Sequence, residues 1–135
     1  MERLFLDANV LFSAAYQPDA GMLRIWKLEN VVLCTSRYAL EEARINLSDE
    51  NQRARLDKLS GSLAFFESGT RKSLPRSVLL PEKDVPILLA AIEARATHLL
   101  TGDVRHFRVY FGKKIEGITI TRPGEYLRRR RDRTA

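Results

Sequence analysis

Cysteine and histidine are scarce in this chain of 135 residues, which contains one cysteine and two histidines. A single cysteine excludes an intramolecular disulfide, and so few thiol and imidazole groups exclude a cysteine-rich zinc site. Cys34 lies in the apolar run 31–34, so we predict that it is a buried thiol.

Long apolar segments are also missing. The longest run, residues 87–92, is far shorter than the roughly 20 residues needed to cross a bilayer. Asp7 interrupts the region that would be apolar in a signal peptide. We therefore expect a cytoplasmic protein without a membrane partner.

Motifs for several kinds of chemistry are absent. The seven glycines are scattered and form no phosphate-binding loop, and no Ser or Cys nucleophile motif occurs. The composition, 44% hydrophobic and 30% charged, is that of an ordinary globular protein of this length. One compact domain is expected.

Positive charge is in excess and unevenly placed. The chain has 23 Lys and Arg against 17 Asp and Glu, and residues 122–135 contain six of the arginines with only two acids. We predict a main domain over residues 1–121 and a basic C-terminal helix or tail over 122–135. Its run Arg128, Arg129, Arg130 and Arg131 is a candidate for binding nucleic acid. A solvated, partly disordered tail is the equally weighted alternative.

Short apolar runs alternate with helical patterns along the chain. Strands are predicted at 4–6, 31–34, 78–80, 98–101 and 118–120, and helices at about 9–15, 21–29, 37–47, 50–66, 85–96 and 123–131. This alternation predicts an α/β fold, with a mostly parallel sheet of about five strands and helices on both faces.

Acidic residues follow the predicted strands. Asp7, Asp84 and Asp103 come after the strands at 4–6, 78–80 and 98–101, and Glu41 and Glu42 lie in the helix after strand 31–34. Taken singly, each Asp could be explained by a helix N-cap role alone. Three of them with a Glu pair, in a basic chain, favour a binding site at the carboxyl edge of the sheet.

Carboxylates crowded at one edge repel one another unless a cation neutralises them. Oxygen ligands suit Mg²⁺ or Mn²⁺ better than zinc. A divalent metal held in this way can activate water for attack on a phosphodiester. The acids therefore predict metal-dependent phosphodiester hydrolysis.

Four segments together resemble the PIN-domain family, and VapC-like toxins and their single-domain relatives in particular. They are Leu6-Asp7-Ala8-Asn9-Val10-Leu11, the pair Glu41-Glu42, Asp84 opening a helix, and Leu100-Thr101-Gly102-Asp103 with His106-Phe107. The resemblance covers residues 3–121. It implies a Rossmann-like sheet with the first strand at its centre, and a metal-dependent endoribonuclease that acts on RNA. It also implies a homodimer with a small antitoxin partner.

Position by position, the resemblance assigns the metal and the catalysis to Asp7, Asp84, Asp103 and one acid of the Glu pair. Glu42 is favoured because Ala43 follows it, as in relatives, although helical periodicity leaves Glu41 open. The family also implies three supporting polar residues, namely Asn9, Ser13 and Thr101.

His106 departs from the family pattern, because many relatives have a further Asp there. It could bind metal, contact phosphate or pack beside Phe107. With one acid fewer, we expect one tightly bound ion and a second that depends on substrate.

Two other functions remain open from the sequence. In a non-catalytic PIN-fold module that binds RNA or protein, the acids would be helix caps only. In a phosphoryl-transfer protein, Asp7 would be the nucleophile, but Asn9 stands where such phosphatases need a second Asp.

Overall fold

A six-stranded sheet forms the centre of the molecule. The computed structural model describes residues 1–68 and 73–134, the last three of these without their side chains. The sheet has the order β3-β2-β1-β4-β6-β5, and every neighbouring pair is parallel except β5 with β6. The strands are β1 Glu2–Leu6, β2 Val31–Thr35, β3 Ala64–Phe65, β4 His98–Leu100, β5 Lys114–Ile115 and β6 Ile118–Thr121. The expected α/β class and the central position of the first strand are confirmed.

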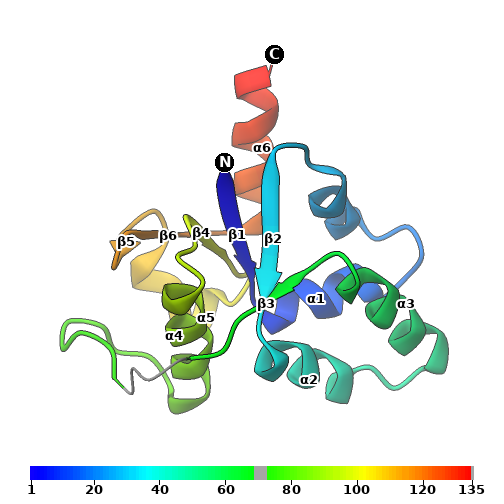
Figure 1. Cartoon of the computed structure of the whole chain (residues 1–135), viewed down its shortest axis with the longest axis horizontal. Coiled ribbons are helices and arrows are strands. Elements are labelled where there is room, and N and C mark those ends of the chain that lie inside the picture. Colours follow the sequence, from blue (N-terminus) through cyan, green and yellow to red (C-terminus); the bar gives the residue numbers. More distant parts are fainter. Residues whose placement is uncertain (69–72, 135) are drawn as a thin grey trace.

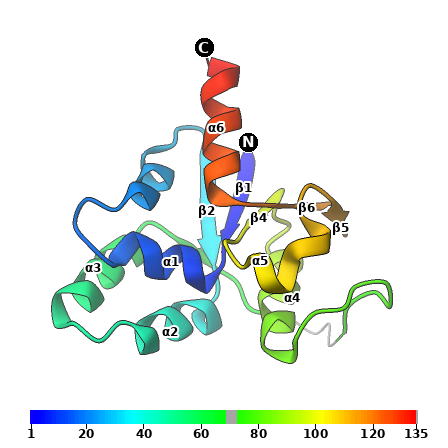
Figure 2. The same ribbon diagram turned by 180° about the vertical axis from the view of Figure 1, so that it is seen from behind.

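Helices lie on both sides of the central strands. In Figures 1 and 2, α1, α2 and α3 lie together on one side of β1 and β2, and α4 and α5 lie on the other. The helices are α1 Ala8–Ala15, α2 Arg37–Asn46, α3 Glu50–Ser60, α4 Val85–Glu93, α5 Val104–Phe107 and α6 Pro123–Thr134. Three short 3₁₀ helices are η1 Gly21–Lys27, η2 Glu82–Asp84 and η3 Arg108–Tyr110.

The core is built on β1 and α4. Leu4, Phe5 and Leu6 are fully buried, as expected for a parallel strand covered on both faces. Ile87 and Leu88 of α4 are also fully buried. Cys34 is buried and its Sγ donates to the carbonyl of Leu4 at 3.4 Å. Burial raises the pKa of this thiol to about 11, so the prediction of a buried thiol is confirmed.

The strand predicted at 78–80 is wrong, because this segment is a loop between Pro75 and Pro81 in which Val78 and Leu80 are partly buried. The side chain of Leu79 is 79% exposed. Its backbone bonds to the hydroxyl of Tyr110 instead of a neighbouring strand: Leu79 N donates to that oxygen at 2.7 Å, and Oη donates back to Leu79 O at 3.2 Å. Asp84 therefore does not follow a strand, and it reaches the sheet edge as the last residue of η2.

The helix predicted over 50–66 is too long. Helix α3 ends at Ser60, before Gly61, and residues 64–65 form β3 beside β2. Gly61 disfavours continuation of a helix, and the aromatic residues that follow favour a strand. The segment predicted as a helix over 21–29 is the 3₁₀ helix η1.

Helix α6 is the predicted basic C-terminal helix, and it packs against the start of β1 (Figure 1). Tyr126 is only 3% exposed, donates a hydrogen bond to Glu2, and meets the ring of His98 edge-on at 5.0 Å. Among the described residues, no helix has both the length and the apolar character needed to traverse a bilayer.

Candidate active site

Four of the predicted acids line one pocket of about 460 Å³ at the carboxyl ends of β1 and β4. Each comes from a different element: Asp7 follows β1, Glu42 lies on α2, Asp84 ends η2, and Asp103 follows β4. The tertiary fold thus brings together carboxylates that lie up to 96 residues apart (Asp7 to Asp103).

Asp7 is held most firmly of the four. Its side chain is 3% exposed, and Oδ1 accepts from the backbone N–H of Ala8 at 2.7 Å. Oδ2 accepts from the Thr101 hydroxyl at 2.8 Å and from the Asn9 amide at 3.1 Å. The pKa of Asp7 is raised to about 6, mainly by burial and to a smaller extent by Asp84 and Glu42, while the hydrogen bonds from Thr101 and Ala8 lower it. A cation nearby would favour the charged form.

Asn9 and Thr101 connect the ends of β1 and β4 beneath the acids. Asn9 Oδ1 accepts from Gly102 N at 2.8 Å, and Thr101 Oγ1 accepts from Asp103 N at 3.1 Å. Residue 102 must be small for this contact, because a Cβ there would lie 3.3 Å from Asn9 Oδ1. Both side chains also donate to Asp7 Oδ2, so they join the two strand ends around that carboxylate.

The glutamate pair is separated by the fold. Ser36 caps α2 by accepting from Ala39 N at 3.1 Å, and this start places Glu42 half-buried in the pocket lining. Glu41 is exposed and is not a lining residue.

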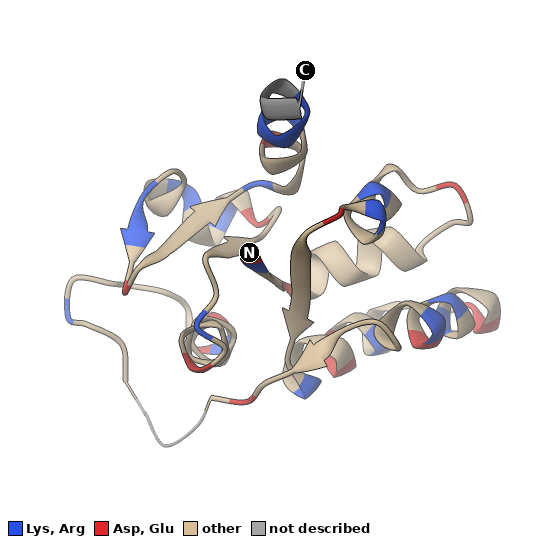
Figure 3. Cartoon of the chain, turned by 45° about the horizontal axis from the view of Figure 1, so that its top comes forward, with Lys and Arg blue, Asp and Glu red and all other residues tan. Residues whose placement is uncertain are grey.

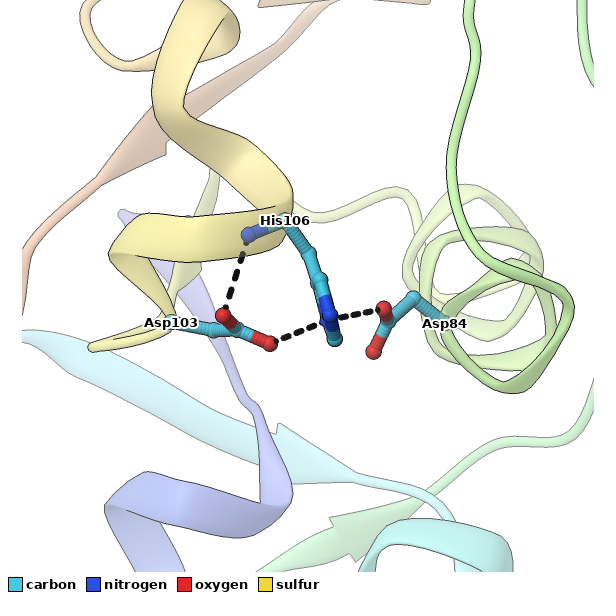
Figure 4. Close-up of side chains that lie close together, drawn as sticks. All are labelled: Asp84, Asp103 and His106. Atoms are coloured by element: carbon cyan, nitrogen blue, oxygen red, sulfur yellow. Dashed lines mark hydrogen bonds and ion pairs between the residues drawn. The ribbon is translucent and has the colours of Figure 1, made fainter.

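Asp84 and Asp103 meet at the ring of His106 (Figure 4). Nδ1 of His106 lies 2.7 Å from Oδ2 of Asp84 and 2.7 Å from Oδ2 of Asp103. Asp103 is also the cap of α5, because its Oδ1 accepts from His106 N at 3.1 Å. Asp84 makes no capping hydrogen bond to α4, so its carboxylate is not explained as a helix cap.

Burial raises the pKa of Asp84, while the neighbouring His106 lowers it. The approach of His106 Nδ1 to Asp84 Oδ2 is an ion-pair contact whose geometry falls short of a hydrogen bond. Neither buried atom has a hydrogen-bond partner within the described part of the chain. Asp84, Asp103 and His106 place ligand atoms within 4.8 Å of one another. Carboxylate oxygens that converge with an imidazole nitrogen in this way are a ligand set that can hold a divalent cation.

The pocket contains residues that the sequence patterns did not identify. Asn46 lies on the lining four residues after Glu42, and this helical spacing could have identified it. Lys83 is a cation on the same lining. Tyr38 donates to the Lys83 carbonyl at 2.9 Å, and burial together with Glu42, Asp84 and Asp7 raises its pKa.

His106 contacts two pocket acids without being a lining residue, and two further groups of predicted residues lie outside the pocket. Ser13 lines a neighbouring hollow with Phe12 and Tyr16. The arginines 128–131 lie on α6, which projects away from the sheet (Figure 3). There, Arg128, Arg130 and Arg131 line a second hollow together with Arg24 and Lys27 of η1.

Comparison with known proteins gives a consistent result. The chain resembles the crystal structure of VapBC2 from Rickettsia felis bound to a DNA fragment from their promoter. The TM-score is 0.68 with 16% identity, over 89% of this chain and 98% of that chain. It also resembles FitAcB from Neisseria gonorrhoeae, with a TM-score of 0.52 and 15% identity over 90% of this chain and 98% of that one.

Among curated proteins, none matches this sequence. The family model described as PIN domain matches residues 3–105, which is most of the chain and includes all four pocket acids. This chain therefore belongs to the PIN-domain family.

Proposed function

We propose that this protein is a metal-dependent endoribonuclease that hydrolyses RNA phosphodiester bonds, and that it is the toxin of a cytoplasmic toxin–antitoxin pair. One observation carries the proposal: Asp7, Glu42, Asp84 and Asp103 line the same pocket, and the Asp84 carboxylate there does not cap the helix that follows it. If the acids were helix caps only, the Asp84 side chain would accept a hydrogen bond from the first turn of α4, and it does not.

The four acids would hold Mg²⁺ or Mn²⁺. When bound, such an ion activates water and offsets the charge that develops on the phosphate. The residues of the chain itself orient and balance this site. Asn9 and Thr101 fix the carboxylate of Asp7, and Lys83 provides the lining with a positive charge that can attract a phosphate.

A second contact with RNA is proposed at the other end of the molecule. The hollow between η1 and α6 is lined by five cationic side chains, Arg24, Lys27, Arg128, Arg130 and Arg131, and by one acid, Glu29. Arg129 lies on the same helix and pairs with Glu125. Positive charge concentrated in a hollow attracts the phosphate backbone irrespective of sequence. Arg128, Arg129, Arg130 and Arg131 would therefore hold RNA while the acidic pocket cuts it.

The proposal includes a protein partner and a second copy of the chain. The fold is similar to that of the VapBC2 complex, which supports a small antitoxin that blocks the pocket. A basic side chain from the antitoxin would complement the four carboxylates of the lining. We propose that the toxin itself is a homodimer.

The test is cleavage of total RNA and of tRNA by purified protein with Mg²⁺, with Mn²⁺ or with a chelator. We expect cuts at defined sites that require metal. Asp7→Asn and Asp103→Asn should abolish them, which also excludes a contaminating nuclease. Glu42→Gln and Glu41→Gln form a matched pair: the first should lose cleavage and the second should retain it.

Two results would contradict the proposal. RNA binding without cleavage by the folded wild type, in every metal, would indicate a non-catalytic module. Equal cleavage by wild type and both Asp variants would mean that the four-acid pocket is not the active site.

A further inference from the structure

His106 contacts two of the pocket acids, Asp84 and Asp103, from beside the pocket lining. It lies on α5, a helix of only four residues that begins directly after Asp103. Its backbone N–H bonds to Asp103 Oδ1, and this short connection directs the ring toward the acids. Figure 4 shows the ring between the carboxylates of Asp84 and Asp103, which approach it from two elements. The side chain of His106 is 20% exposed and that of Asp84 is 8% exposed.

The contacts of the ring are close but are not hydrogen bonds to Asp84. Nδ1 lies 2.7 Å from one oxygen of each carboxylate. Within the described residues, neither Nδ1 nor Asp84 Oδ2 has a hydrogen-bond partner of suitable geometry. Buried polar atoms that lack a well-aligned hydrogen-bond partner reduce stability. A cation shared by the three side chains would satisfy the nitrogen and both oxygens together.

The three ligand atoms lie within 4.8 Å of one another. Two ligands of one ion with bonds of about 2.1 Å lie at most about 4.2 Å apart, so small side-chain shifts would bring all three onto a single ion. The donor set is mixed, with one imidazole nitrogen among carboxylate oxygens. Mg²⁺ is bound by oxygen ligands and prefers to keep its waters. Transition-metal ions accept imidazole, and their affinity for a mixed site rises from Mn²⁺ to Co²⁺.

We propose that His106 is a nitrogen ligand of the metal in this pocket, and that it makes the site select a first-row transition-metal ion over Mg²⁺. This inference rests on the proposed metal-dependent function and adds to it the identity of the ion. The alternative is that His106 is a positively charged side chain that neutralises Asp84 and Asp103 in place of a metal.

The experiment uses the full chain, freed of metal with a chelator, and needs no activity measurement. Calorimetric titration should show that affinity rises from Mg²⁺ to Mn²⁺ and from Mn²⁺ to Co²⁺. His106→Asp restores an all-oxygen set, so the ratio of Co²⁺ to Mg²⁺ affinity should fall by about tenfold or more. The control is His98→Asn, because His98 packs on Tyr126 outside the pocket, and it should leave the order unchanged.

Pulsed electron paramagnetic resonance of bound Mn²⁺ tests the ligand directly. The wild type should show coupling to a ¹⁴N nucleus, and labelling histidine with ¹⁵N should replace it by ¹⁵N coupling. This measurement holds even if His106→Asp fails to fold, since it is made on the wild type.

The outcomes separate this inference from the proposed function. Mn²⁺ bound without histidine coupling, or metal binding that His106→Asp leaves unchanged, would overturn the role of His106. Metal-dependent cleavage that requires Asp7 would survive that result. If no ion binds and RNA is cut in chelator, the metal dependence itself is wrong.

Discussion

Thr101 is the residue on which the geometry of the acids depends most. It is fully buried at the end of β4, where its hydroxyl donates to Asp7 Oδ2 and accepts from Asp103 N. It therefore orients two of the acids at once. Serine or threonine at a strand end is common, so this double role is a property of the folded site.

Thr101→Val should lower the free energy of unfolding by about 1–3 kcal/mol, because it removes the donor to the buried Asp7 carboxylate and the acceptor for the part-buried N–H of Asp103. It should also weaken metal binding. Thr121→Val is the matched control on the adjacent strand β6: Thr121 is also buried, but its hydroxyl makes only a 3.5 Å contact. Denaturant unfolding of both variants measures the difference, and equal losses would contradict the role given to Thr101.

Asp7 should make the metal-free protein less stable as pH rises. Its pKa is about 6 in the folded protein against an ordinary value of 3.8, so the folded state binds the proton more tightly. The stabilisation is complete below about pH 4 and is lost as the pH passes 6. A pKa difference of this size between the folded and unfolded states corresponds to about 3 kcal/mol in the free energy of unfolding.

The measurement is urea unfolding from pH 4 to 7 in chelator, for wild type and Asp7→Asn. The stability of the wild type relative to the variant should decline over this range, because only the wild type titrates at residue 7. Added Mn²⁺ should reverse the decline by binding the folded state. Parallel pH profiles for the two proteins would contradict the raised pKa.

At the scale of elements, two of the shortest helices carry residues of the candidate site, and the longer strands and helices hold those short helices in place. Asp84 is delivered by the three-residue η2 and His106 by the four-residue α5. Helix α2 contributes Glu42 from its second turn, after the Ser36 cap has set where the helix begins. The sheet edge holds these pieces in register because β1 and β4 end side by side.

Helix α6 and η1 should act together in binding RNA. Replacing Arg24 and Lys27 of η1 by glutamine should weaken binding of single-stranded RNA in chelator. If both side chains contact phosphates, the slope of log K against log salt concentration should become less negative by about 1.4. Lys58→Gln with Lys113→Gln removes the same charge from exposed positions outside the hollow. An equal effect of the two double variants would indicate attraction by net charge alone.

At the scale of the whole molecule, α6 ties the C-terminal segment to the start of the chain. Tyr126 is buried against His98 and bonds to Glu2, and Arg130 donates to the carbonyl of Glu29 at 2.6 Å. These contacts link β1, β4 and the turn before β2. The basic segment is therefore joined to the sheet as well as to the proposed RNA surface.

Tyr126→Ala should destabilise the protein by about 3–5 kcal/mol, the loss typical of removing a large buried aromatic side chain. Truncation after Thr121 should be at least as severe, because it removes all of α6. Tyr16→Ala is the control, since that ring is 53% exposed, and it should have a much smaller effect. Thermal unfolding checks all three, and a stable, fully folded 1–121 fragment would show that α6 is dispensable for the fold.

Alternating apolar runs and helical patterns were enough to predict the α/β class, four of the strands and most of the helices. Burial of Leu4, Phe5 and Leu6 could be expected because an unbroken apolar strand must be covered on both faces. Local patterns failed where tertiary contacts decide. Residues 78–80 look like a strand, but Tyr110 takes the backbone hydrogen bonds of Leu79. Residues 64–65 continue a helical spacing, yet pair with β2.

The sequence by itself determined which acids are candidate metal ligands, because residue type and position in the PIN pattern can be read without a structure. Only the tertiary structure chose Glu42 over Glu41 as a lining residue, left Asp84 without a cap, and placed His106 between two carboxylates. The physical reason is that helix rotation, burial and distances between side chains depend on how distant elements pack. A pKa near 6 for Asp7 likewise exists only once the chain is folded around it.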